Sequence, residues 1–166
     1  MRIALSLFLM LLLPIGADAK EPKIDRIDVF EYGIYTADIN ARVAAPDAAA
    51  GYRNVVTNVR NAAKTRTIPA QKGIQFGFRY KIVGSPRGKQ VPVHVVTIFP
   101  PPGLSDPATH QLKAKSEYDV VKVIGQETFK SYNFENDWEV LPGEWTMQIW
   151  YGGVMLQEQK FNVVKQ

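Results

Sequence analysis

Strict alternation of apolar and polar residues is the feature that most restricts how this chain folds. In the stretch IQFGFRYKIV, residues 74–83, nearly every second residue is apolar. Successive side chains of a β-strand point to opposite faces, so this pattern predicts a half-buried strand. The side chains expected on its core side are Ile74, Phe76, Phe78, Tyr80 and Ile82.

The same strand pattern recurs along the rest of the chain, between turn residues. Further strands are predicted at 24–35, 54–59, 91–99, 118–124, 128–134, 145–151 and 155–164. Seven or eight short strands, without any amphipathic helical stripe, predict an all-β fold, an immunoglobulin-like antiparallel β-sandwich. Irregular parity at Gly33 favours a bulge there. Residues 36–53 fit either an irregular loop or a short helical turn.

The last predicted hairpin, PGEWTMQIWYGGVMLQEQKFNVV, is rich in aromatic residues. Gly152 and Gly153 supply the two positive φ angles of a two-residue primed turn. Trp145, Met147 and Ile149 share a parity and are expected in the core. Trp150 has the opposite parity, so it lies either against a loop or in solvent.

The N-terminus has the pattern of a secretory signal. Arg2 precedes an apolar run at residues 3–13, and Ala17-Asp18-Ala19 is a small-x-small cleavage site. The run is about half the length of a membrane span. We therefore expect residues 1–19 to be a signal peptide cleaved near Ala19, leaving 20–166 as one domain with no transmembrane segment. The predicted location is periplasmic or secreted.

Two segments together resemble a known family. YNFENDWEVLPGEWTMQIWYGGVMLQEQKFNVV and the earlier VFEYGIYTA are similar to an uncharacterised family of bacterial secreted proteins, domain of unknown function 3859. The resemblance runs from about residue 24 to 164 and is most specific in the Pro-Gly-x-Trp hairpin. It implies a small envelope domain, immunoglobulin-like, with no established activity and no catalytic residue.

No residue pattern indicates catalysis, and we predict that the protein is not an enzyme and holds no metal or cofactor. The chain has no cysteine, which excludes disulfides and thiolate metal sites. His94, within a predicted strand, is interpreted as a satisfied or surface histidine, and His110 as a loop residue. The acidic residues Glu135, Asp137, Glu139 and Glu144 lack the spacing of a calcium loop. They are predicted to face water along a strand edge.

Charge is unevenly distributed along the chain, whose formal net charge is +4. Residues 48–105 contain nine basic side chains and no Asp or Glu. These cations either form one surface for an anionic partner or pair with acidic strands across the sheets. The candidate binding residues are Arg60, Lys64, Arg66, Arg87, Lys89 and Trp150.

Two functions therefore compete at the level of sequence. The first is a non-catalytic binding or assembly module of the bacterial envelope that contacts another protein. The second is a binder of anionic glycan, lipopolysaccharide or lipid through the basic segment 48–105. A hydrolase or metal protein with a site that no motif announces is a third, weaker alternative. Nucleic acid is not an expected partner, because the predicted export separates the chain from it.

Overall fold

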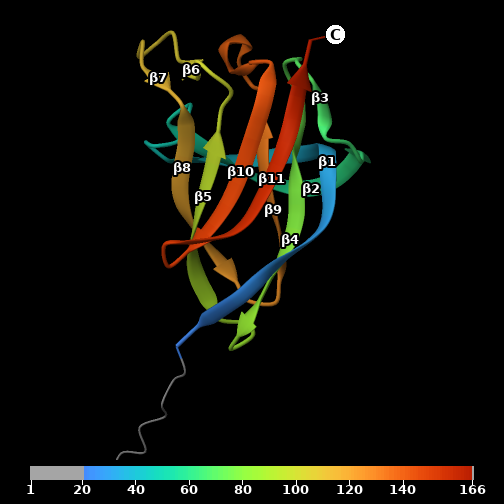
Figure 1. Ribbon diagram of the computed structural model, residues 1–166, viewed down its shortest axis with the longest axis vertical. Coiled ribbons are helices and arrows are strands. Elements are labelled where there is room, and N and C mark those ends of the chain that lie inside the picture. The colour runs from blue at the N-terminus through green and yellow to red at the C-terminus, as the bar shows by residue number, and fades with distance from the viewer. Residues whose placement is uncertain (1–20, 166) are drawn as a thin grey trace, which may run out of the picture.

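Two sheets pack face to face in the computed structural model, which describes residues 21–165. The predicted signal peptide and its cleavage near Ala19 lie outside these residues. The first sheet has the strand order β2-β1-β4-β9 and the second β3-β11-β10-β5-β8. Their strands pair in antiparallel fashion except for β3, which lies parallel to β11. Figure 1 shows β5, β10 and β11 in front of the first sheet. The all-β, immunoglobulin-like sandwich predicted from the alternation is confirmed.

The strand bounds locate each element along the chain. The first sheet contains β1 (Lys23–Ala44), β2 (Tyr52–Ala63), β4 (Gln75–Ser85) and β9 (Glu127–Asn133). The second contains β3 (Thr67–Pro69), β5 (Gln90–Ile98), β8 (Lys115–Val123), β10 (Gly143–Tyr151) and β11 (Val154–Val164). A small hairpin of β6 (Leu104–Ser105) and β7 (Leu112–Lys113) and a 3-10 turn, η1 (Asp137–Glu139), complete the described chain.

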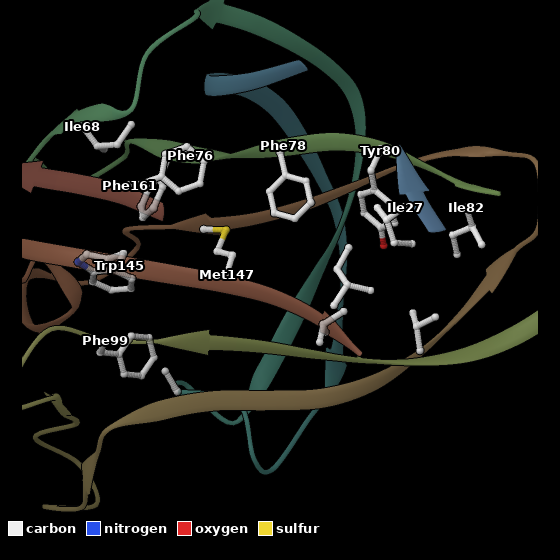
Figure 2. Packing of buried hydrophobic residues seen from close by; sticks show 14 of the residues in the cluster. Ile27, Ile68, Phe76, Phe78, Tyr80, Ile82, Phe99, Trp145, Met147 and Phe161 are labelled. Carbon is white, nitrogen blue, oxygen red and sulfur yellow. The ribbon is translucent and has the colours of Figure 1, made fainter. Parts of the chain in front are cut away.

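The core lies between the sheets and consists of the side chains that alternation assigned to it. Phe76, Phe78 and Tyr80 of β4 are fully buried, as are Trp145 and Met147 of β10. Figure 2 shows these side chains pointing toward one another across the space between the sheets. Ile82 and Ile149 are equally buried, whereas Ile74 is partly buried and packs against the cluster.

The closing hairpin has the predicted turn. Tyr151 pairs with Val154, and both residues between them, Gly152 and Gly153, have positive φ angles of 56° and 79°. Such angles match the right-handed twist of the flanking strands. Trp145 starts the hairpin in the core, and its indole N–H donates to the carbonyl of Leu141 at 2.8 Å.

Most of residues 36–53 form strand, instead of the irregular loop or the short helical turn expected for them. Only a short turn interrupts the strands. The distal part of β1, from Thr36 to Ala44, continues beyond β4 and pairs only with β2. We call residues 36–63, this two-stranded extension with its connecting turn, the arm. In Figure 1 the teal arm crosses behind the second sheet and reaches the side of β8.

Gly33 marks the point where β1 enters the arm. Gly33 pairs regularly with Gly77 of β4. The register shift lies in the pairing of β1 with β2, between Ile34 and Tyr35. The irregularity predicted at Gly33 is therefore one residue away. A second kink lies at Asn58, which has a φ of 51° and donates to the Asp38 carboxylate at 2.7 Å.

Candidate ligand cavity

A cavity of about 460 Å³ lies where the arm crosses the strands β8 and β9. Its walls come from β2 and the arm turn, from the facing residues of β8 and β9, and from Tyr80 and Val95 of the core strands. The arm is fastened beside it: the backbone N–H of Ala49 donates to Ser116 Oγ at 3.1 Å. Lys113 Nζ donates to the carbonyl of Ala48 at 2.7 Å.

The alternation of β9 divides its side chains between two parts of the cavity. Lys130 and Tyr132 point between the sheets, where Tyr132 contacts Phe76. Phe129 points to the other side and packs against Tyr35 of β1, with ring centroids 4.6 Å apart. The cavity therefore borders both faces of β9, the edge strand of the first sheet.

Lys130 is an unpartnered cation at the inner part of the cavity. The residue is only 5% exposed, and its Nζ lies 5.3 Å from the centroid of the Tyr118 ring on β8. Among residues 21–165, no carboxylate forms an ion pair with it, and no hydrogen bond involves its ammonium group. A nearly buried lysine without a counter-charge is costly, and the cation–π contact compensates its charge only in part.

Lys122 of β8 and Arg53 of β2 add further positive charge to the same cavity. Lys122 Nζ donates to Thr128 Oγ1 at 2.7 Å. Burial, together with the positive charges of Arg53 and Lys130, lowers the pKa of Lys122 below its usual value. Arg53 and Lys130 therefore both act on the charge of Lys122.

The carboxylates of the cavity are held by other groups. Glu135 accepts hydrogen bonds from Tyr52 at 2.6 Å and from Arg42 at 3.1 Å. Glu139 is buried and accepts from Tyr132 and from the backbone N–H groups of residues 135 and 136. Burial raises the pKa of Glu139, although these hydrogen bonds act in the opposite direction. Glu135 thus links the arm to the segment that follows β9, and Glu139 links η1 to β9.

This arrangement corrects one sequence-based prediction. The acidic residues were expected to face water, but Glu139 is only 4% exposed because it caps the 3-10 turn η1. Glu135 is likewise half-buried by its bonds to the arm. Asp137 and Glu144 do face solvent and form ion pairs with Lys72 at 3.8 Å and Lys160 at 2.8 Å.

Several polar atoms at the cavity lack a hydrogen-bond partner within the described residues. They are the hydroxyl of Tyr80 and the side-chain oxygens of Asn54 and Asn133. Buried polar groups in folded proteins nearly always have a partner. These atoms make part of the cavity wall polar.

The structure separates the candidate residues of the basic segment into two groups. Arg60, Lys64 and Arg66 lie near the start of β4, where the Arg66 guanidinium stands 4.7 Å from the centroid of the Tyr32 ring. Arg87 and Lys89 lie beyond the end of β4, an 11-residue strand that spans roughly 35 Å. Figure 1 shows β3 at the upper end of the molecule and the β4–β5 turn at the lower end.

None of these five cations pairs with a carboxylate in the part of the chain that the structure describes. They therefore form neither one continuous basic surface nor a set of cross-strand ion pairs. Trp150, the sixth candidate, is partly buried on the outer face of the second sheet, opposite His94. Its indole N–H donates to Gln148 Oε1 at 2.9 Å.

Sequence reasoning missed Lys122 and Lys130, although the strands carry a signal for them. Lys122 is in phase with the inward-pointing Tyr118 and Val120, and Lys130 is in phase with Tyr132. A lysine at an inward position of a strand indicates a buried charge, and buried charges need a partner.

His94 has the role predicted for it on the outer face of the second sheet. Its ring nitrogens lie 2.9 Å from Asp119 Oδ1 and 3.2 Å from Glu117 Oε2. Within residues 21–165, no cluster of histidine and carboxylate side chains is suited to hold a metal ion. No helix in the same range is long and apolar enough to cross a membrane.

The fold places the chain in the class of immunoglobulin-like proteins. The structure of an immunoglobulin-like protein from Pseudomonas aeruginosa is similar, with a TM-score of 0.57 and 27% identity over 90% of this chain and 100% of that chain. A family model, Domain of unknown function (DUF3859), matches residues 23–163, and the chain belongs to this family. This confirms the resemblance seen in the sequence.

Two other comparisons add nothing to the fold or the site. The DNA-bound alkylpurine DNA glycosylase AlkC of Pseudomonas fluorescens is a weaker likeness, with a TM-score of 0.36 and 12% identity. It covers 59% of this chain and 27% of that chain, and it carries no argument here. No curated protein sequence matches the chain.

Proposed function

We propose that this domain is a non-catalytic binding module of the bacterial envelope, periplasmic or secreted, and that its cavity takes a small anionic organic ligand. The observation that carries the proposal is Lys130, a nearly fully buried cation with no counter-charge in the described chain. A buried charge is tolerated when something else compensates it. An anion bound beside Lys130 would do so.

The size and lining of the cavity support an organic ligand instead of a bare ion. Its volume of about 460 Å³ falls in the range of small-molecule sites, roughly 300–1,000 Å³. Tyr118 of the lining is partly exposed and offers aromatic surface to an organic group. The proposed role is binding, because ammonium groups hold an anion without altering it.

The sheet edges support a protein partner less well. Pairing with a partner strand needs a regular free edge. The outer edge strand β2 is kinked at Asn58 and has several register shifts. The start of β8 is contacted by the arm, through the bond from the Glu117 N–H to the Asp47 carbonyl at 3.2 Å. A contact with another envelope protein remains a prediction for which no particular surface is favoured.

The test is a nuclear magnetic resonance titration of the folded domain at low salt with phenyl sulfate and phenyl phosphate. We expect saturable shifts of the backbone amides near Arg53, Lys122 and Lys130 with at least one of the two. In a Lys130→Met variant the dissociation constant should rise by about tenfold or more. The methionine keeps an unbranched side chain, one atom shorter, and removes its charge. Absence of shifts with both anions would contradict the proposal.

An Arg87→Glu, Lys89→Glu variant is the matched control. It removes more positive charge than Lys130→Met does, but at the exposed β4–β5 turn. We expect it to bind the two anions as the natural domain does. If this variant loses binding while Lys130→Met retains it, the anions bind at the basic β4–β5 turn and not in the cavity. That outcome would favour the alternative function, binding of a glycan or lipid through segment 48–105.

A further inference from the structure

The cavity lining holds four basic side chains and three carboxyl groups, so its charges are not balanced. Arg79 is shared between Glu31 at 3.8 Å and Glu127 at 3.6 Å, and Glu135 is paired with Arg42. Glu139, the third carboxyl group of the lining, accepts from Tyr132 and from backbone N–H groups and forms no ion pair with a cavity cation among residues 21–165. Arg53, Lys122 and Lys130 therefore have no carboxylate partner within these residues. They come from three strands, β2, β8 and β9, that meet only in the folded domain.

From this imbalance we infer that the ligand carries a doubly charged oxyanion of the phosphomonoester class, held by Lys122, Lys130 and Arg53. The inference rests on the proposed function, because it names the chemistry of the ligand at the same site. A singly charged group would leave at least two of the three cations uncompensated. A phosphomonoester brings close to two negative charges and three acceptor oxygens in one compact group.

The surroundings of the lysines fit such a group. The hydroxyl of Thr128 already bonds Lys122 Nζ and so fixes its position. The Tyr118 ring lies beside Lys130, which leaves an aromatic surface for the organic part of the ligand. Because the cavity is several times larger than a phosphate ion needs, the phosphate is attached to a further group, such as a sugar or a ring.

The decisive comparison is between phenyl phosphate and phenyl sulfate, which share one scaffold and differ in charge. At pH 7.5 phenyl phosphate is mostly a dianion, whereas phenyl sulfate is a monoanion. We expect the dissociation constant of phenyl phosphate to be at least about tenfold lower in the titration. Equal constants would overturn the inference and leave the proposed anion site intact. Absence of binding by either would instead remove the proposed function.

Lowering the pH tests the same point on the unaltered protein. Near pH 5 phenyl phosphate becomes a monoanion, because the second ionisation of a phosphomonoester lies near pH 6. Its advantage over phenyl sulfate should then fall to less than about threefold. Phenyl sulfate keeps its charge and controls for titration of Glu127, Glu135 and Glu139, the carboxyl groups of the cavity walls. An advantage that persists at pH 5 would overturn the inference.

A Lys122→Met variant tests the contribution of one cation. We expect it to lose most of its preference for phenyl phosphate over phenyl sulfate while still binding both at the cavity. Circular dichroism checks that the variant is folded. If it is not folded, the comparison of the two ligands at pH 7.5 and pH 5 on the natural domain tests the inference instead. An unchanged preference in the folded variant would exclude Lys122 from the site and contradict the inferred triad.

Discussion

Gly33 shows how closely the backbone of β1 is approached by its neighbour. Its φ is +139°, and a Cβ atom built on it would overlap the carbonyl oxygen of Ala63 at the end of β2. Glycine is the residue that tolerates such backbone angles and such close contact. The position therefore sets where β2 and the arm can join the first sheet.

Replacing Gly33 by alanine should lower the free energy of unfolding by about 2–4 kcal/mol, because the new methyl group forces β1 and β2 apart at a strained φ. Urea denaturation measures the loss. Gly73→Ala is the control, since Gly73 also has a positive φ, +87°, but open space around it. There we expect a loss of about 1 kcal/mol. Equal losses at the two sites would show that the contact with Ala63 does not matter.

At the scale of elements, the arm is a part of the sandwich in which only two strands pair. Beyond Tyr35 it no longer pairs with β4, and it leaves Ile39, Val43 and Val55 exposed. A few bonds to β7 and β8 hold its turn in place, among them those to Lys113 and Ser116. Segments with few buried contacts open locally before the whole domain unfolds.

A Lys113→Met, Ser116→Ala double variant should therefore loosen the arm without unfolding the sandwich. We expect the amides of residues 36–63 to exchange their hydrogens at least about fivefold faster, since each lost bond contributes about 1 kcal/mol. The amides of β4 and β10 should change little. Hydrogen exchange followed by mass spectrometry makes the measurement.

Lys160→Met provides the comparison for that experiment, because it removes only an exposed ion pair with Glu144. It should leave exchange in the arm unaltered. Uniform acceleration in the arm and in the core strands of the double variant would mean that the arm opens only with global unfolding.

At the scale of the whole molecule, one aromatic cluster joins the two sheets. Trp145 of β10 lies with its ring centroid 5.7 Å from that of Phe76 on β4 and 4.9 Å from that of Tyr132 on β9. Phe134 and Phe99 complete the contacts around its ring. The cluster unites strands that are distant in the sequence, so its loss weakens both sheets together.

Replacing Trp145 by alanine should reduce the free energy of unfolding by about 3–5 kcal/mol, from the lost burial and the cavity left behind. Chemical denaturation followed by circular dichroism gives the value. Trp150→Ala removes the same side chain from the outer face, where it is only partly buried, and should cost about 1–2 kcal/mol. A comparable cost for both would contradict the assignment of Trp145 as the centre of the core.

The positions of most strands and core residues could be predicted from the sequence, because both depend on local alternation. Side chains such as Phe76, Phe78 and Met147 follow a period of two, and one buried face is enough to define their register. The turn at Gly152-Gly153 is equally local, since two adjacent glycines set its geometry. Residues 36–53 have no comparable pattern, so the extension of β1 into the arm could not be predicted from the sequence.

The candidate site was decided only by the tertiary structure. Arg53, Lys122 and Lys130 line one cavity because the chain passes from the second sheet to the first between β8 and β9. The arm, which comes earlier in the chain, crosses these two strands and brings Arg53 to them. The same topology places Arg66 and Arg87 at opposite ends of β4, although both belong to one basic segment. Alternation determines which way a side chain points within its strand, but the distance between two charges depends on how the strands are arranged in space.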